Sequence, residues 1–386
     1  MSKPRKFPMK KGALLFSAGQ NAYEFVMELA PGHHGESLVL ARKRTAQGPE
    51  GDVVLKCVDV SAQPAAGMHK AAARLTEEVR LSTYLDHPGI ARARALKQVE
   101  GVLYAIIECV EGNSLNTLLS VVPERITRFS DAFILYVGAE VAAALHHAHT
   151  RTDEAGQPLG IIHRAVDLDR IWVGWNGQVK LTDFGLALST LSGRIASTVR
   201  RPDGNAYCAS PEALLGLAVD ARSDLFQLGL TLYELATGSH PLDPSEGLSA
   251  GVEAALSARE RTRVEQALQS AKEAGLEASA VEELILRAAT YTPQDVAQWA
   301  AKLSGPLTQP LSRLLQRDPT ERQQTAAELE AELRACLDRL GAYGAKEAAV
   351  ELDQVLTAAG AQLVRLEGGG LPPPPQRSQD DISTQP

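Results

Sequence analysis

Residues Ile161 to Gly185 read I-I-H-R-A-V-D-L-D-R-I-W-V-G-W-N-G-Q-V-K-L-T-D-F-G, and this stretch is the most informative part of the chain. The apolar run Ile171–Gly174 and the run Gln178–Thr182 each have the length of a strand. They are separated by Asn176-Gly177, a pair that favours the tight turn of a β-hairpin. The stretch therefore predicts a polar loop, a two-stranded hairpin and an Asp-Phe-Gly triplet, in that order.

The loop and the triplet resemble the centre of a protein kinase, in which the patterns H-R-D-L-x-x-x-N and D-F-G lie at the two ends of one hairpin. The residues that match are His163, Arg164, Asp183, Phe184 and Gly185. Two of the pattern's chemical groups are replaced: Ala165 stands at the position of the catalytic Asp, and Arg170 stands at the position of the metal-binding Asn. The resemblance implies the framework of a phosphotransferase in which two chemical groups have been replaced.

Two features upstream resemble the phosphate-binding parts of that family. Gly32 and Gly35 fall on the second and third glycines of the loop G-x-G-x-x-G-x-V, although a Pro-Gly hairpin turn explains them equally well. The strand Val53–Lys56, V-V-L-K, resembles the V-A-I-K strand, which makes Lys56 the expected phosphate-binding lysine. Taken alone, Lys56 would be interpreted as a strand lysine that faces water.

A helix expected over His69–Leu85 ends in the sequence D-H-P-G-I, which resembles the turn after the kinase C helix. Counting back from this turn places Glu78 at the position whose carboxylate pairs with the strand lysine in that family. A surface glutamate on a charged helix is the alternative. The apolar strand Leu103–Val110 resembles the hinge between two lobes, where backbone groups from Glu108 to Val110 would bind adenine.

Motifs further along the chain resemble the parts of a kinase that hold its large lobe together. Ser210-Pro211-Glu212 resembles A-P-E, and Asp318–Arg322 resembles D-P-x-x-R. The resemblance implies an ion pair between Glu212 and Arg322. Asp224 lies in a segment similar to the buried F helix, where this Asp holds the backbone of the catalytic loop.

The two replacements bear directly on phosphoryl transfer, in which the protein positions the reactants and metal ions neutralise charge. Ala165 has no group that accepts a proton, and a positioned general base contributes roughly 100- to 10,000-fold. Asp167, two residues further on, is the candidate substitute. Arg170 has five N–H donors and no acceptor, so it cannot bind a metal ion. Its guanidinium would instead face the phosphates, in place of the metal ion. Asp183 retains one metal ligand, and Arg170 would take over part of the charge that the second metal ion neutralises, so we expect ATP to bind with reduced dependence on Mg²⁺.

The composition is ordinary for a soluble globular protein, with 386 residues that are 44% hydrophobic and 22% charged. No run of about eighteen apolar residues occurs, and the basic N-terminus precedes no apolar segment of signal-peptide length, so we expect neither a membrane span nor secretion. The four cysteines lack C-x-x-C spacing, which favours a reducing cytoplasm. A net charge of −8 gives no support to nucleic-acid binding.

These features predict an α+β, bilobal fold similar to that of protein kinases, with a small β-rich lobe and a larger, mainly helical lobe. The expected segments are a basic flexible leader at 1–20, the small lobe at 21–108, the large lobe at 109–340, an accessory helix at 341–367 and a disordered Gly/Pro-rich tail at 368–386. An Ala- and Glu-rich helical insert is expected at about 243–306. The accessory helix would either pack on the large lobe or bind a partner.

Three functions remain open. The leading hypothesis is a catalytically impaired protein, similar to a pseudokinase of the bacterial eukaryotic-like serine/threonine type, that binds ATP and acts as a signalling regulator or scaffold for a protein partner. The first alternative is an atypical but active serine/threonine kinase. The second alternative, a scaffold that binds no nucleotide, is disfavoured because Lys56, Glu78 and Asp183 remain. The sequence predicts neither the partner nor the oligomeric state.

Overall fold

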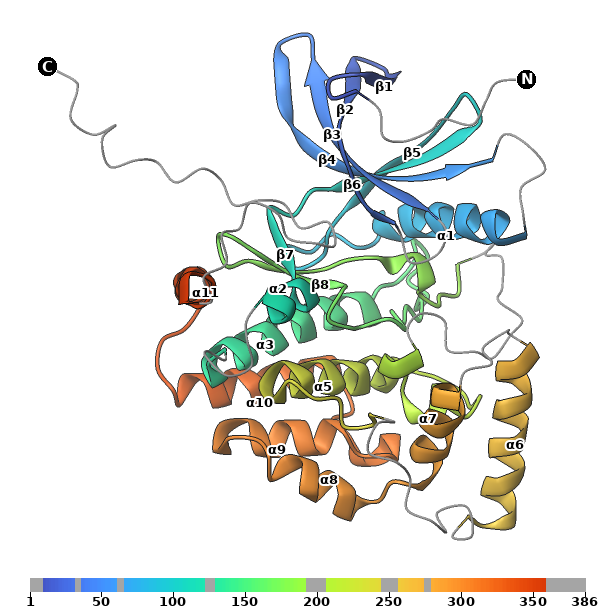
Figure 1. Cartoon of the computed structure of the whole chain (residues 1–386), viewed down its shortest axis with the longest axis vertical. Coiled ribbons are helices and arrows are strands. Elements are labelled where there is room, and N and C mark those ends of the chain that lie inside the picture. Colours follow the sequence, from blue (N-terminus) through green and yellow to red (C-terminus); the bar gives the residue numbers. More distant parts are fainter. Residues whose placement is uncertain are drawn as a thin grey trace, which may run out of the picture.

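The computed structural model describes residues 10–31, 36–60, 66–121, 129–191, 206–243, 256–273 and 279–358, and it has the expected α+β, bilobal architecture (Figure 1). A curled sheet and one helix form the small lobe at the top of the view, and helices dominate the large lobe below it. Gly32 and Gly35, which were assigned to a phosphate-binding turn, lie outside the described residues. Residues 1–9 and 359–386 lie outside them as well.

The small lobe is built on a six-stranded antiparallel sheet with the strand order β1-β2-β3-β4-β6-β5. Its strands are β1 (Leu14–Ala18), β2 (Asn21–Pro31), β3 (Ser37–Thr45), β4 (Gly48–Asp59), β5 (Ala93–Val99) and β6 (Val102–Glu108). Alternating apolar residues give the sheet two buried faces. On one face Phe16 packs on Tyr23 and Tyr104, with ring centroids 4.7 and 4.6 Å apart. On the other face, helix α1 (Ala66–Ser82) buries Leu75 in a cluster with Leu103 of β6.

The expected flexible leader at residues 1–20 is wrong for its second half, because the chain is folded from β1 onward. Leu15 and Phe16 of β1 are only 1% and 3% exposed and belong to the small-lobe core. Gly19, which has a φ of +62°, permits the tight turn from β1 into β2. Burying a large apolar side chain contributes about 1.5–3 kcal/mol, which explains why this short segment joins the sheet.

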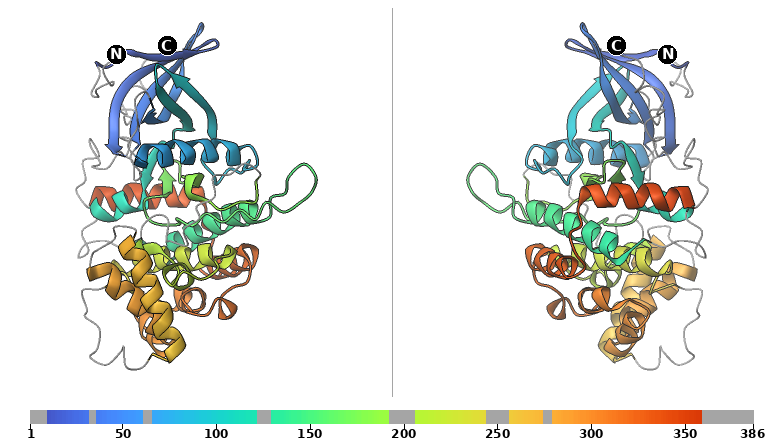
Figure 2. Two further views of the ribbon diagram at one scale, coloured as in Figure 1. Left: turned by 90° about the vertical axis from the view of Figure 1, so that its right-hand side faces the viewer. Right: turned by 90° about the vertical axis from the view of Figure 1, so that its left-hand side faces the viewer.

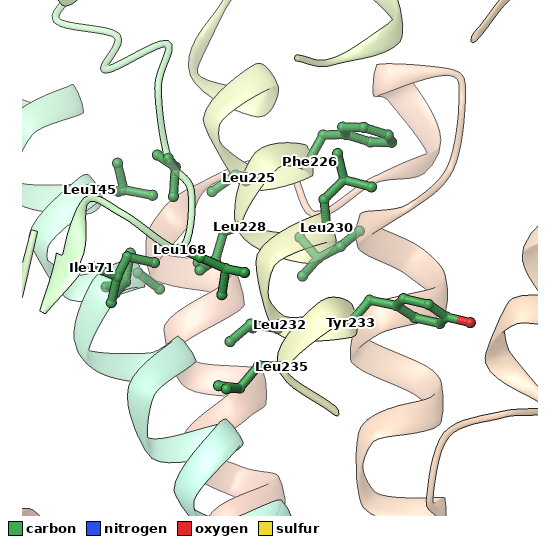
Figure 3. Packing of buried hydrophobic residues seen from close by; sticks show 14 of the residues in the cluster. Leu145, Leu168, Ile171, Leu225, Phe226, Leu228, Leu230, Leu232, Tyr233 and Leu235 are labelled. Carbon is green, nitrogen blue, oxygen red and sulfur yellow. The ribbon is translucent and has the colours of Figure 1, made fainter. Parts of the chain in front are cut away.

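The large lobe is arranged around helix α5 (Ala221–Thr237), in which every residue from Ser223 to Tyr233 is buried. A helix buried at consecutive positions must be enclosed on all sides. Figure 3 shows Leu168, in the loop before the hairpin, beside Leu228 of α5, and Ile171 of the same core further from the helix. The N-terminus of α5 is closed by a capping box formed by Asp220 and Ser223.

Helices α3 (Asp131–His149), α9 (Gly305–Leu314) and α10 (Ala326–Asp338) pack against α5, and the remaining elements complete the large lobe. The remaining helices are α2 (Leu115–Val121), α4 (Pro211–Leu214), α6 (Ala258–Glu273), α7 (Ser279–Thr290), α8 (Pro293–Ala300) and α11 (Ala345–Ala358), with short 3₁₀ turns η1 (Phe184–Leu186), η2 (Ala206–Cys208) and η5 (Pro319–Glu321). A small sheet is formed by β7 (Gly112–Ser114), β8 (Ile171–Gly174) and β9 (Val179–Leu181), in the order β7-β8-β9. The predicted hairpin is therefore confirmed as β8 and β9.

Helices lie in both of the expected helical segments, within the described residues. The region at about 243–306 contains α6, α7 and α8. The accessory helix is α11, which packs on the large lobe, where Ala348 and Leu352 are part of its core. Among the described helices, none has both the length and the apolar character needed to cross a membrane.

Candidate functional site

Lys56 of β4 and Glu78 of α1 form the predicted ion pair within the small lobe. The lysine Nζ lies 2.8 Å from both carboxylate oxygens of Glu78, and both residues are buried. Strand pairing fixes the lysine backbone, because Lys56 lies between Leu38 of β3 and Ala105 of β6. The pair therefore fixes α1 against the sheet.

Asp183 joins this pair from the large lobe. Its Oδ1 accepts a hydrogen bond from Lys56 Nζ at 2.8 Å. The residue adopts the left-handed conformation with a φ of +67°, which is uncommon for a residue other than glycine. Phe184 is buried and packs edge-on against His163 at 4.5 Å. At Gly185, a Cβ would lie 3.3 Å from the carbonyl oxygen of Arg74, so glycine permits α1 to approach closely.

Arg170 occupies the centre of the site, and its contacts were not predicted from the sequence. Its Nε donates to Asp183 Oδ2 at 3.1 Å, and its Nη1 donates to Asp167 Oδ2. The arginine side chain is only 4% exposed. Asp167 is buried too, and its Oδ1 accepts hydrogen bonds from the backbone N–H groups of Asp169 and Arg170. The carboxylate proposed as a substitute base is thus paired with the arginine.

These contacts form one continuous chain of charges, in the order Glu78, Lys56, Asp183, Arg170 and Asp167. The chain crosses from the small lobe to the large lobe and alternates in sign. Burial opposes the charged form of Arg170, but Asp183 and Asp167 outweigh it and raise the pKa of the guanidinium. Burial, opposed by Lys56, raises the pKa of Glu78 to about 7. Burial also opposes the charged form of Lys56, but Asp183 and Glu78 outweigh it and raise the pKa of the lysine, so both cations stay charged at neutral pH.

Ala165 is buried, and it brings only a methyl group to the loop position where the family pattern has Asp. Its backbone N–H donates to His163 Nδ1 at 3.2 Å. His163 Nε2 in turn lies 3.0 Å from the carbonyl oxygen of Thr182, which connects the loop to the end of β9. The loop thus keeps its shape without the reactive carboxylate.

The loop backbone is held by Asp224 at the start of α5, as the sequence predicted. Its two oxygens accept hydrogen bonds from the N–H groups of His163 and Arg164, at 2.8 and 2.7 Å. His149 Nε2 lies 2.8 Å from the same carboxylate, a contact that the sequence did not reveal. Gln227, one turn further along α5, donates to the carbonyl oxygen of Arg164. These bonds hold Arg164 in a left-handed conformation, with a φ of +66°.

Glu212 and Arg322 form the predicted ion pair beneath the loop. Two hydrogen bonds of 2.9 Å join the guanidinium to both oxygens of the carboxylate. Arg322 also lies over the ring of Phe226, at 4.7 Å. Burial alone would raise the pKa of Glu212, but the hydrogen bonds and the charge of Arg322 outweigh it and lower the pKa. The pair links α4 to the segment that follows α9.

Glu108 and Val110 lie in the segment that joins the lobes. The N–H of Glu108 is used within the sheet, since it donates to the carbonyl oxygen of Arg92 at 2.8 Å. The Glu108 side chain lies 2.7 Å from Nζ of Lys180 on β9. This side chain therefore connects the small lobe to the hairpin, a role that the sequence did not indicate.

Comparisons with known proteins agree with this architecture. Residues 23–332 match the family described as protein kinase domain. The chain is 32% identical over 230 residues to the tyrosine-protein kinase MasK of Myxococcus xanthus, covering 59% of this chain and 34% of MasK. It is 33% identical over 185 residues to the serine/threonine-protein kinase PknJ of Mycobacterium tuberculosis, covering 47% and 29%.

A third relative is the serine/threonine-protein kinase PrkC of Bacillus subtilis, which is 28% identical over 176 residues, covering 46% of this chain and 25% of PrkC. The matched part therefore spans about a quarter to a third of the length of these relatives.

Proposed function

The chain belongs to the protein kinase family, and from this premise we propose that it is a kinase-like signalling protein that binds ATP with little dependence on Mg²⁺ and transfers phosphate poorly or not at all. It would act as a regulator or scaffold for a protein partner in the cytoplasm. Membership of the family implies ATP, Mg²⁺ and protein substrates in general. The proposal concerns how this chain departs from that general scheme.

The observation that carries the proposal is the pairing of Asp183. One of its oxygens accepts from Lys56 and the other accepts from Arg170. A magnesium ion needs oxygen ligands arranged as an octahedron, and a guanidinium offers none. The residues at this site therefore do not fit the pair of metal ions that kinases use, since Arg170 replaces one ligand and engages the other.

The same two cations support the binding of ATP itself. Lys56 and Arg170 contact different oxygens of the Asp183 carboxylate and stay charged at neutral pH. A guanidinium has five N–H donors, so Arg170 keeps donors for phosphate oxygens beyond those that bind Asp183 and Asp167. We therefore assign the phosphates to Lys56 and Arg170, and the adenine to the backbone between Glu108 and Val110.

Poor phosphate transfer follows from the loop. Ala165 supplies no base, and the carboxylate of Asp167 already accepts from Arg170 and from two backbone N–H groups. An acceptor held in this way by a buried cation is a weak base, because proton transfer would leave the guanidinium unpaired. The expected loss is roughly the 100- to 10,000-fold contribution of a general base.

Calorimetric titration with ATP, with Mg²⁺ present and with Mg²⁺ chelated, tests nucleotide binding. The wild type should bind in both conditions, with dissociation constants that differ by less than about threefold, which is under 1 kcal/mol. Lys56→Met should lose binding. Arg170→Asn should bind only with Mg²⁺. Failure of the wild type to bind ATP in either condition would refute the proposed nucleotide site.

Phosphate transfer is tested with the double variant Ala165→Asp, Arg170→Asn. Incorporation of labelled phosphate into a generic protein substrate should be close to background for the wild type and should rise in the double variant. Arg334→Met, which alters an exposed arginine of α10, serves as the control for general effects of substitution. Robust transfer by the wild type would instead identify an active, atypical kinase.

A further inference from the structure

Helix α11 lies directly against the turn of the β8–β9 hairpin. Gly177 forms this turn with a φ of +76°, and its carbonyl oxygen accepts a hydrogen bond from the hydroxyl of Tyr136 on α3. A Cβ built on Gly177 would lie 1.8 Å from the carbonyl oxygen of Ala345 and 2.9 Å from the backbone nitrogen of Ala349. The first turn of α11 is thus in backbone contact with the hairpin, which only glycine permits.

Polar contacts fix α11 in this place. Glu351 of α11 accepts hydrogen bonds from the backbone N–H and the hydroxyl of Ser130, both at 2.7 Å. The hydroxyl of Tyr343 donates to the same carboxylate at 2.7 Å, and its ring lies 5.9 Å from that of Tyr136. Ser130 is also the N-cap of α3. One carboxylate therefore ties α11 to the start of the helix that supports the hairpin turn.

The two faces of α11 differ sharply in burial. Ala348, Leu352 and Val355 belong to the core of the large lobe, and Ala348 is 0% exposed. Val350, on the opposite face, is 56% exposed. Figure 2 shows the helix lying lengthwise along the side of the large lobe, at the level of α2. The helix is therefore part of the packed large lobe. It nevertheless begins beyond residue 332, where the match to the family ends.

Arg170 and Asp183 flank the β8–β9 hairpin, whose turn lies against α11. Strand β8 starts immediately after Arg170, and β9 ends two residues before Asp183. The turn also reaches the segment between the lobes, because the N–H of Trp175 donates to the carbonyl oxygen of Glu111 at 2.9 Å. A displacement of the turn would therefore reach both partners of the Arg170–Asp183 ion pair.

We propose that α11 is a positioning element for the site, which holds the β8–β9 hairpin so that Arg170 and Asp183 remain paired. The helix acts through the hairpin turn, where Ala345 and Ala349 lie against Gly177. Residues that lie beyond the family match would thus control the pairing of Arg170 with Asp183 through the hairpin turn. This inference concerns the hairpin and holds whether or not ATP is the ligand.

Two matched substitutions on α11 of the full chain test the proposal. Ala348→Glu places a charge on the buried face and should detach the helix, whereas Val350→Glu places the same charge on the exposed face. Hydrogen–deuterium exchange is measured in the hairpin, in α11, and in α8 and α9 as an internal reference. Ala348→Glu should speed exchange in α11 and in the hairpin by about tenfold or more, with α8 and α9 unchanged. Val350→Glu should leave all three regions unchanged.

A second readout separates positioning from simple loss of stability. The ATP affinity of Ala348→Glu, measured without Mg²⁺, should fall together with hairpin protection, and the conservative variant Ala348→Ser should restore both. This readout rests on the proposed nucleotide site, whereas the exchange measurement does not, so the two can fail separately. If Ala348→Glu does not fold, Glu351→Gln combined with Tyr343→Phe weakens the same contact more gently. Rapid exchange in α11 with an unchanged hairpin, in whichever variant folds, would overturn the proposal.

Discussion

Replacing Arg170 with methionine removes the cation at the centre of the charge chain. Arg170 and Asp167 are both buried, and removing one partner of a buried ion pair destabilises a protein by about 3–5 kcal/mol. Two features favour the lower end of this range. Asp183 keeps Lys56 as a partner, and Asp167 keeps two hydrogen bonds from backbone N–H groups. We therefore expect a loss of about 3 kcal/mol, or roughly 4 °C in melting temperature for a chain of this length.

The same substitution should create a response to Mg²⁺. With the guanidinium gone, Asp183 and Asp167 can offer oxygen atoms to a cation, so Mg²⁺ should raise the melting temperature of the variant and leave that of the wild type unchanged. Both effects are measured by scanning calorimetry with and without Mg²⁺.

The control is Arg334→Met, since Arg334 is 42% exposed and pairs with Glu140 and Glu330 at the surface. Exposed pairs contribute about 0–1 kcal/mol, so this variant should melt close to the wild type. Equal melting temperatures for Arg170→Met and Arg334→Met would refute the assignment of Arg170 as a buried pairing residue.

Two further predictions concern the large lobe. The pKa of Glu212 is lowered by Arg322 from its ordinary value of 4.5, so ionisation of Glu212 stabilises the fold above that pH, and the contribution is lost as the pH falls below it. Urea unfolding is therefore measured at pH values above and below 4.5. As the pH falls, the free energy of unfolding should decrease more steeply for the wild type than for Glu212→Gln, and parallel pH dependences would contradict the role given to the pair. At Gly229 in α5, a Cβ would lie 2.7 Å from Cβ of Leu314, so Gly229→Ala should cost about 1–3 kcal/mol by overpacking, more than the gain in helix propensity of about 1 kcal/mol. The control is Gly305→Ala, where a Cβ meets no atom within 4 Å, and a variant Gly229→Ala that melts at or above the wild type would show that Leu314 moves aside.

The sequence was sufficient to predict those contacts that follow from the order of the motifs along the chain. The pairs Lys56–Glu78 and Glu212–Arg322 were predicted because each residue lies in a motif whose place in the fold is set by its neighbours along the chain. The pairing of Arg170 was not predicted, since a long side chain can reach several partners and its choice depends on the packed loop. The spacing of Asp167 and Arg170, three residues apart, was the one local signal for it.

Two other features lay beyond the motifs altogether. Strand β1 was missed because five residues, L-L-F-S-A, carry too little periodicity to separate a strand from a tail, although Gly19 marked the turn that follows. The place of α11 could not be predicted either. Its amphipathic pattern indicated a buried face, but a pattern does not identify the surface that covers it.

Strand β1 also affects whether the edge of the small-lobe sheet can pair with a strand of another chain. An edge strand exposes unpaired backbone groups that can recruit a strand from another chain, and proteins limit this risk with short, irregular or charged edges. Here one edge is the five-residue β1, whose pairing is broken by a bulge between Leu14 and Phe16. The other edge, β5, carries the exposed residues Arg94 and Lys97. A chain that began after Ala18 would expose the eleven-residue β2 instead, and it should aggregate more readily than the intact protein.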